Sequence, residues 1–230
     1  MPVEGSVRDR RRAETVAEIK TSALAQLATA GPAGLSLRAV ARDVGMTVQS
    51  LYHYFDSRDA LLSALVTDGH HALADAAESA AAACRGRVPA DRLVIVAGAF
   101  RAWALANTPA FLLLYGTPVP GFDPGPASDS GSAALRLAAP FLEVVFEGWT
   151  PAELAAIEVP GGVVPAGDGG DIPLPAGALV LFIGLRAHMH GLVMLELLEH
   201  LYPFNGDAGT MFAAEMRRSA AQVAALRATL

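Results

Sequence analysis

The sequence is poor in residues that mark several classes of protein. Cys84 is the only cysteine, so no disulfide can form within the chain, and nothing around it has the spacing of metal ligands. We expect Cys84 to be a small apolar side chain on a helix, in a reducing compartment. Aromatic residues make up 7% of the chain, whereas alanine is abundant. Because alanine is the best helix former, this composition favours an all-helical protein.

Long apolar runs and a secretory signal are also missing. The N-terminus is polar and charged, with no apolar segment behind it. The longest uninterrupted apolar stretch, Ala176 to Leu185, is ended by Arg186 and falls short of the roughly 20 residues of a membrane span. We therefore expect a cytoplasmic protein with no membrane partner.

The sequence has no overall excess of basic residues, since its net charge is −6. The charge is unevenly distributed: residues 1–59 carry eight Lys or Arg and seven Asp or Glu, whereas the remainder carries nine and sixteen. A basic cluster lies at Arg8, Arg10, Arg11 and Arg12. It is either a solvated arm or part of a nucleic-acid contact surface, and the distribution places any such surface near the N-terminus.

Glycine and proline divide the rest into helical segments. Gly31-Pro32 and Gly45 end two early segments, and Gly/Pro/Asp-rich stretches occupy Pro118 to Gly131 and Pro160 to Pro175. Almost nothing between them reads as a strand. We predict an all-α fold, with a small three-helix domain over residues 1–57 and a larger helical domain over residues 58–230. The helices are predicted at residues 9–30, 37–44, 48–55, 58–84, 90–107, 109–115, 132–147, 151–158, 176–201 and 207–229.

Two short segments around Gly45 have the pattern of a helix-turn-helix. Ser36 is a good N-cap for the first, in which Leu37, Val40, Ala41 and Val44 share one face. Gly45 supplies the positive φ of a tight turn, and Thr47 caps the second segment. The second helix of such a unit enters the major groove of DNA.

The unit provides side chains for both kinds of DNA contact. The start of the second helix would meet the base edges, where Gln49 can pair with adenine, Ser50 can hydrogen-bond and Val48 can touch a thymine methyl. Ser36 and the basic or hydroxyl side chains around the unit would contact phosphates. The predicted DNA-binding residues are Ser36, Arg38, Arg42, Thr47, Val48, Gln49, Ser50, Tyr52, His53 and Arg58.

These residues carry a resemblance to a known family. The segment from Gly34 to Phe55, above all Leu-Tyr-His-Tyr-Phe followed by Asp-Ser-Arg-Asp-Ala-Leu-Leu, resembles the DNA-binding domain of the TetR family over roughly residues 10 to 65. The resemblance implies a homodimer of all-helical subunits, each with an operator-binding domain and a larger ligand-sensing domain. Most members are repressors that a small molecule releases from the operator. Many members carry Lys, Pro or Gly where this chain has Val48 and Gln49, and Lys where it has Arg58.

A second, partial resemblance lies in the C-terminal part. His190 to Glu196 and Asn107 to Gly116 look like parts of a C-terminal domain class named for a Trp, a His and a Gly. The Trp of that class tends to stand four residues before the His, where this chain has Arg186.

A helical sensor is expected to hold its ligand in an apolar cavity lined by aromatic side chains. The predicted ligand-binding residues are Trp103, Phe111, Tyr115, Phe141, Phe182, Arg186 and His190. Each aromatic residue could equally belong to the core. His188 and His190 stand two apart and point to different faces of a helix, so we expect neither a metal nor another cofactor.

The last two predicted helices suggest a dimer interface built as a four-helix bundle. Its predicted residues are Leu192, Leu195, Glu199, Phe212, Met216 and Val223. Packing within one subunit is the alternative. A two-fold dimer would also bring two recognition helices to half-sites about 34 to 36 Å apart.

The expected partners are a double-stranded DNA operator, a small-molecule effector and a second copy of the chain. The function that follows is a ligand-responsive regulator, most often a repressor on a palindromic operator, with an apolar or amphipathic effector. Two alternatives are an enzyme and a helical protein that does not bind DNA, either an adaptor or small-molecule-binding protein or one associated with a membrane. Membrane attachment would need a basic amphipathic face, whereas the larger part of the chain is acidic. We find no nucleophile elbow, phosphate loop or paired carboxylates, and the Gly167 to Asp171 loop lacks calcium-loop spacing. A purely structural head would not need Gln49, Ser50 and His53 on its surface.

Overall fold

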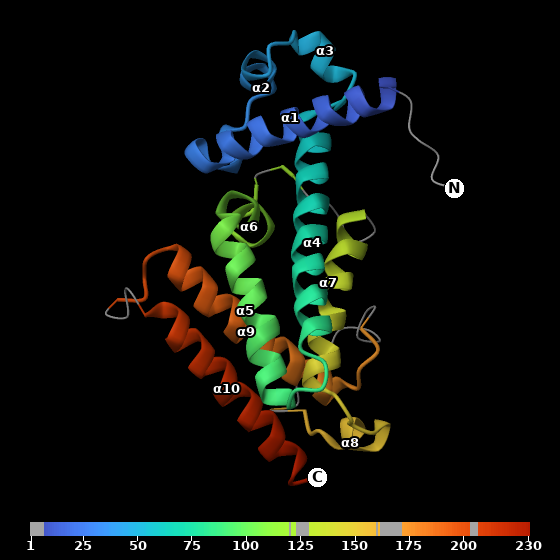
Figure 1. The fold of residues 1–230 in the computed structure, drawn as a ribbon, viewed down its shortest axis with the longest axis vertical. Helices are drawn as coiled ribbons and strands as arrows, with labels where there is room; N and C mark the ends of the chain where they lie inside the picture. Colours follow the sequence, from blue (N-terminus) through green and yellow to red (C-terminus); the bar gives the residue numbers. More distant parts are fainter. Residues whose placement is uncertain (1–6, 120, 123–128, 160, 162–171, 203–206) are drawn as a thin grey trace. The chain divides into compact units, whose positions relative to one another are not determined.

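The protein is all-helical, as its composition predicts. The computed structural model describes residues 7–119, 121–122, 129–159, 161, 172–202 and 207–230, and these contain helices but no strand (Figure 1). The Gly167 to Asp171 loop lies outside the described residues. The elements are α1 (Val7–Ala30), a 3-10 turn η1 (Pro32–Gly34), α2 (Leu37–Asp43), α3 (Val48–Tyr52), α4 (Arg58–Ala83), α5 (Pro89–Ala106), α6 (Thr108–Tyr115), α7 (Asp129–Val145), α8 (Pro151–Ala156), α9 (Ala176–Leu197) and α10 (Ala208–Arg227).

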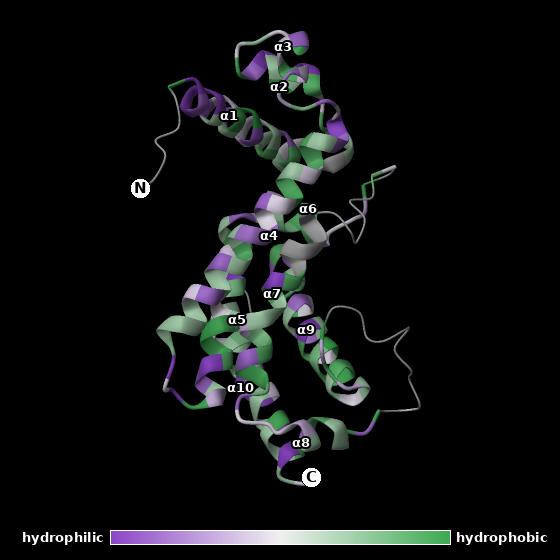
Figure 2. Ribbon diagram, turned by 90° about the vertical axis from the view of Figure 1, so that its right-hand side faces the viewer, coloured by the Kyte–Doolittle hydropathy of each residue, from purple (hydrophilic) through white to green (hydrophobic). Residues whose placement is uncertain are grey.

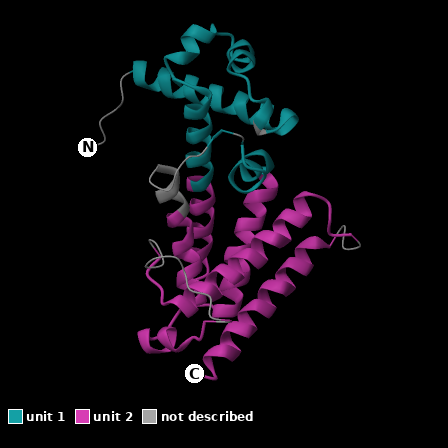
Figure 3. Cartoon of the chain, turned by 180° about the vertical axis from the view of Figure 1, so that it is seen from behind, with its two compact units in different colours: residues 1–70, 107–132 teal, residues 71–106, 133–230 magenta. Residues whose placement is uncertain are grey.

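The chain divides into two compact units (Figure 3). Unit 1 comprises residues 1–70 and 107–132, and unit 2 comprises residues 71–106 and 133–230. The helix α4 contributes residues to both units, and α6 belongs to unit 1 although it follows α5 of unit 2. The sequence predicts a domain boundary at residue 57. That boundary concerns function and stays a prediction, because the two units are defined by packing contacts alone.

One apolar side of α1 forms part of the core of unit 1. Ile19, Ala23 and Leu27 of α1 are buried against Leu51 of α3 and Leu61 of α4, among others. Side chains at a spacing of 3.6 residues face the same side of a helix, so one stripe is removed from water while the polar residues of α1 stay outside. This core fixes α2 and α3 on α1.

Buried or half-buried arginines join the helices of unit 2 through ion pairs. Arg92 of α5, with a side chain only 2% exposed, donates to Glu143 and Glu147 of the α7 region, each at 2.6 Å. Arg101 of α5 makes a two-pronged pair with Glu196 of α9. Planar guanidinium groups match carboxylates in this way, which gives each pair a defined geometry.

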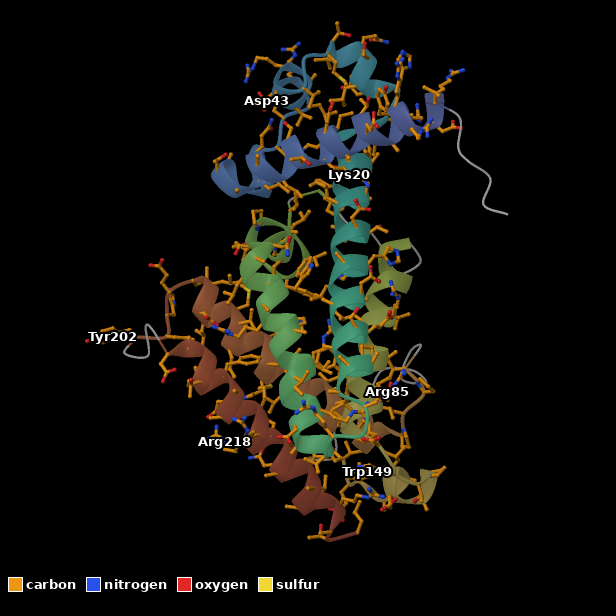
Figure 4. All side chains as sticks on the ribbon, viewed as in Figure 1. Lys20, Asp43, Arg85, Trp149, Tyr202 and Arg218 are labelled. Atoms are coloured by element: carbon orange, nitrogen blue, oxygen red, sulfur yellow. The ribbon has the colours of Figure 1, made fainter. Side chains whose placement is uncertain are left out.

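The helix α10 is tied at its end to α8. Arg227 donates to Glu153 at 2.8 Å and lies over the ring of Trp149, 5.3 Å from its centroid. Arg227 and the Thr150 cap of α8 lower the pKa of the Glu153 carboxyl to about 2. Trp149 is labelled in Figure 4.

The helix α9 is more apolar than its longest uninterrupted run suggests. The helix has 22 residues, and an 18-residue window within it has a mean hydropathy of 1.7, with 22% of that window buried. By length and composition alone the helix could cross a membrane. The sequence-based expectation rests on the run from Ala176 to Leu185 alone, which is too short for a membrane span. Arg186 ends that run, but apolar residues continue beyond it and keep the mean hydropathy of the helix high. One side of this helix is buried in unit 2, and exposed residues such as Ile183, Ala187 and Leu195 leave another side open to water.

Candidate nucleic-acid interface and effector cavity

The helix-turn-helix expected around Gly45 is formed by α2, the turn and α3 in unit 1. Ser36 caps α2 by accepting a hydrogen bond from the Ala39 N–H, and Thr47 caps α3 by accepting one from the Ser50 N–H at 3.1 Å. Gly45 has a φ of +70°. This backbone conformation costs free energy in an L-residue that has a side chain, whereas glycine adopts it readily. The backbone then closes through a hydrogen bond from the Met46 N–H to the Ala41 carbonyl, 2.9 Å long.

The recognition helix α3 is shorter than its sequence pattern predicts. It ends at Tyr52 rather than Phe55, because the His53 and Tyr54 N–H groups bond three residues back, to the Ser50 and Leu51 carbonyls. Such bonds tighten the last turn of a helix. Leu51 and Phe55 are both buried and hold this segment on the core of unit 1.

The side chains predicted to meet DNA differ in how far they are free to do so. Five of them that can touch bases or phosphates are exposed: Arg38, Arg42, Gln49, Tyr52 and His53. Ser36 and Thr47 are exposed but serve as caps, and the Ser50 hydroxyl lies 2.9 Å from that of Thr47. Half-buried Val48 packs against the core of unit 1.

Arg58 has a structural role in this unit. Its Nε donates to the Leu35 carbonyl at 3.2 Å, and a terminal nitrogen lies 3.7 Å from the Asp59 carboxylate. It therefore holds the start of α4 to the segment before α2.

Asp43 joins the end of α2 to α1. Its carboxylate accepts hydrogen bonds from Ser22 and Gln26 of α1, both at 3.2 Å (Asp43 is labelled in Figure 4).

One arginine outside the predicted DNA-binding residues lies beside the end of α3. Arg12 of α1 donates to the His53 carbonyl at 3.3 Å and lies over the Tyr54 ring, 4.9 Å from its centroid. Arg8, Arg10 and Arg11 precede it on the same exposed, hydrophilic end of α1 (Figure 2). The basic cluster was visible in the sequence, but local periodicity does not show that it folds beside α3.

Unit 2 contains a narrow cavity between α5, α7, α9 and α10. Its cavity volume is about 30 Å³, enough for one or two water molecules. Its walls are mostly apolar, and the polar side chains among its described lining residues are Arg186, His190 and Ser219. The main apolar lining residues are Leu93, Phe100, Leu137, Phe141, Val145, Phe182, Leu185, Met189 and Met216.

The cavity brings together four of the seven residues predicted to bind a ligand. Phe141, Phe182, Arg186 and His190 line it. Trp103 lies on α5 outside the described lining residues, and Phe111 and Tyr115 belong to α6 of unit 1. There the Tyr115 ring lies 5.0 Å from that of Phe111 and edge-on to that of His70.

His190 is held as a neutral side chain in this cavity. Burial, followed by the nearby positive charge of Arg186, lowers the pKa of its imidazole to about 4. Its Nδ1 lies 3.0 Å from the Arg186 carbonyl, and its ring lies 4.7 Å from that of Phe100. His188 instead faces Glu215 of α10, 3.2 Å away, so the two histidines belong to different surroundings.

The residues predicted for a dimer interface fall into two groups. Leu195 and Glu199 are exposed and Leu192 is half-buried. Phe212, Met216 and Val223 are at most 7% exposed within a single chain, so they are core side chains of unit 2 rather than surface ones. For these three residues the structure agrees with the alternative, packing within one subunit, because helical spacing does not indicate which chain covers an apolar face.

The N-terminal and the C-terminal parts of the chain each match a known protein family. Residues 19–65 match the family described as bacterial regulatory proteins, tetR family, and residues 93–219 match the family described as tetracyclin repressor-like, C-terminal domain. The chain belongs to the TetR family. The C-terminal description does not mention the Trp-His-Gly class, and membership of that class stays a prediction.

Individual relatives are regulators as well. The chain is 38% identical over 144 residues to HTH-type transcriptional regulator Rv1816 of Mycobacterium tuberculosis, an alignment that covers 63% of this chain and 61% of that protein. The alignment thus spans less than two thirds of the relative. That relative is described as a transcriptional regulator of the helix-turn-helix type.

Solved structures share the fold over almost the whole chain. The structure described as regulatory protein SCO4313 is 33% identical, with a TM-score of 0.72 over 93% of this chain and 98% of that one. The TetR family transcriptional regulator PfmR from Thermus thermophilus is 16% identical, with a TM-score of 0.60 over 88% and 97%. The second likeness concerns the fold alone.

Proposed function

We propose that this regulator is a repressor that binds a palindromic operator as a homodimer and leaves it when a small apolar or amphipathic effector binds in unit 2. The observation that carries the DNA-binding part is that Gln49 of α3 is exposed, as are Arg38 and Arg42 of α2 and His53 directly after α3. Base-reading and phosphate-binding groups then lie on one helix-turn-helix. We propose a cytoplasmic location, where the DNA is.

The homodimer is supported by the exposed face of α9. Ile183, Leu195 and Leu198 are large apolar side chains that one chain leaves 41 to 49% exposed. Between them, exposed Gly184, Ala187 and Gly191 are small and would let a second helix approach closely. A large open groove beside them, lined by residues of α8, α9 and α10, has a volume of about 900 Å³. A two-fold pairing of these faces would supply the two recognition helices that a palindrome requires.

Release by an effector is supported by the continuity of α4. This helix begins at Arg58 in unit 1 and runs to Ala83 in unit 2. An effector shifts the equilibrium only if it binds the DNA-free form more tightly than the DNA-bound form. A tilt of α4 caused by ligand binding would change the separation of the recognition helices and so lower operator affinity.

The first experiment is a titration of the purified protein against DNA from upstream of its own gene, across a series of salt concentrations. We expect sequence-selective binding that weakens steeply with salt, as phosphate contacts require. Expression of a reporter gene placed under the control of that DNA should rise when the gene for this protein is deleted. A folded, dimeric protein that fails to bind the DNA at low salt would contradict the proposal and favour the adaptor.

The dimer is tested separately by sedimentation. Ala187→Glu places a charge in the exposed small-residue stretch of α9 and should convert the dimer to a monomer. Ala225→Glu on an exposed position of α10 is the matched control for the added charge elsewhere in unit 2. An Ala187→Glu protein that remains dimeric would place the interface elsewhere.

A further inference from the structure

We propose that the effector is an amphiphilic carboxylate, whose charged group binds Arg186 and whose apolar body lies between the aromatic and methionine side chains of the cavity in unit 2. This inference rests on the proposed function and specifies the chemistry of its effector site. Three observations support it: the charge of the lining, the pairing of the other arginines, and the composition of the walls.

Arg186 supplies the single charged side chain among the described lining residues of the cavity. His190, one helical turn further along α9, is neutral at physiological pH because burial lowers its pKa. The remaining polar side chain is the buried Ser219 of α10. The cavity therefore offers a positive charge and two neutral hydrogen-bonding groups, and no described lining residue offers a carboxylate.

Arg186 also differs from the other arginines in its surroundings. Unit 2 has five arginines that are buried or half-buried in the described chain. Four of them pair with carboxylates: Arg92, Arg101, Arg136 and Arg227. For Arg186, no carboxylate of a described residue lies within ion-pair distance. A half-buried guanidinium without an opposite charge is stabilised when an anion arrives.

A carboxylate suits this position better than a phosphate monoester. The guanidinium binds a carboxylate through two parallel hydrogen bonds, and one negative charge is balanced by the one positive charge. A dianion would leave one charge uncompensated beside Phe100 and Phe182, in walls that are otherwise apolar.

The lining of the cavity is suited to an effector with an apolar part, but the side chains must move to admit it. A volume of about 30 Å³ holds water but no hydrocarbon chain or ring, so side chains must move when an effector binds. Met189 and Met216 line the cavity from α9 and α10. Methionine has three rotatable bonds and adapts to irregular shapes at low cost. Their displacement would couple binding to a shift of α9 and α10.

The test is ligand binding by calorimetry with the full chain in the absence of DNA. The probes are octanoate, phenylacetate, and their uncharged and cationic counterparts octanol, octylamine and 2-phenylethanol. We expect at least one carboxylate to bind roughly tenfold or more tightly than its uncharged counterpart, because hydrogen bonds to charged groups are the strong ones. Preference for octanoate would indicate a fatty-acid-like effector, and preference for phenylacetate an aromatic acid.

Variants separate the role of Arg186 from general effects of charge. Arg186→Gln should abolish the preference for the carboxylate, and Arg186→Lys should retain part of it. The matched control is Arg217→Gln, which removes an exposed arginine of α10 and should leave binding unchanged. Circular dichroism verifies that each variant is folded.

Each remaining outcome decides against the proposal. Equal binding of acids and alcohols, no carboxylate binding to the folded protein, or unchanged carboxylate affinity in Arg186→Gln would overturn it. Operator binding is measured on the same preparations. Carboxylate binding by a protein that does not bind operator would overturn the proposed function alone, whereas operator binding without carboxylate binding would overturn this inference alone.

Discussion

The guanidinium of Arg12 lies over the ring of Tyr54 while it donates a hydrogen bond to the His53 carbonyl. One side chain of α1 thus contacts both residues that follow the recognition helix. The contact joins the basic end of α1, which also carries Arg8, Arg10 and Arg11, to the segment that directly follows α3. Phosphate contacts from this end would fix the register of α3 on DNA without reading sequence.

Replacing Arg12 with alanine should weaken operator binding and reduce its salt dependence. The arginine is exposed, so the cation–π contact contributes only about 0.5–1 kcal/mol, and the melting temperature should change little. Fluorescence anisotropy with labelled operator at several salt concentrations measures both quantities. Arg85→Ala, at an exposed position of unit 2 that Figure 4 labels, is the control. Unchanged affinity and slope in Arg12→Ala would show that Arg12 does not take part in DNA binding.

Two residues of the helix-turn-helix should respond to mutation in different ways. Gln49→Ala should cost about 1–3 kcal/mol on operator and relax the base preference at one position, because it removes a base-reading side chain. Arg38→Ala should weaken binding to all sequences and reduce the salt slope by about one, because it removes a phosphate contact. Affinities for operator and for single-base variants of it separate the two. The same pattern for both variants would contradict the division of roles.

The helix-turn-helix could be predicted from the sequence because its determinants are local. Ser36, Gly45 and Thr47 act on their own turns of chain, and each takes the predicted conformation. The bounds of the long helices also agree with prediction to within a few residues, since alanine-rich segments between glycines and prolines have no competing structure.

The composition of the effector cavity could be predicted only in part. The spacing of aromatic residues identifies buried positions but not their neighbours, so Phe111 and Phe141 looked equivalent although they lie in different units. The same holds for Phe212 and Met216, which are apolar at helical spacing whether the covering surface belongs to the same chain or to a second one. Ion pairs such as that of Arg92 with Glu143 join positions 51 residues apart, and no local signal marks them.

Removing the acidic partners of Arg92 should destabilise the protein more than removing Arg92 itself. In Glu143→Gln/Glu147→Gln the buried guanidinium loses both carboxylates, and breaking a buried pair in this way costs about 3–5 kcal/mol. Arg92→Met leaves two carboxylates that are half exposed to water and fills most of the same space, so it should cost less. Urea denaturation at one protein concentration measures both. A larger loss in Arg92→Met would show that shape rather than charge governs this position.

The stability of the protein should fall between pH 7 and pH 5 in a way that depends on His190. Its folded-state pKa of about 4 lies below the ordinary value of 6.5, so the unfolded chain binds a proton more readily. The stabilisation is therefore present above pH 6.5 and is lost as the pH falls towards 4. A shift of this size corresponds to about 2 kcal/mol between pH 7 and pH 5.

The measurement compares pH profiles of the free energy of unfolding for the natural protein and for His190→Gln, at equal protein concentration because a dimer's stability depends on it. The glutamine variant should lose the part of the slope that His190 contributes while keeping the slope that the carboxylates produce below pH 5. His188→Gln is the matched control, since His188 is exposed on the same helix and faces Glu215. If His190→Gln and the natural protein have parallel profiles from pH 7 to pH 5, the imidazole is not held neutral by the cavity, and Arg186 does not face an uncharged neighbour there.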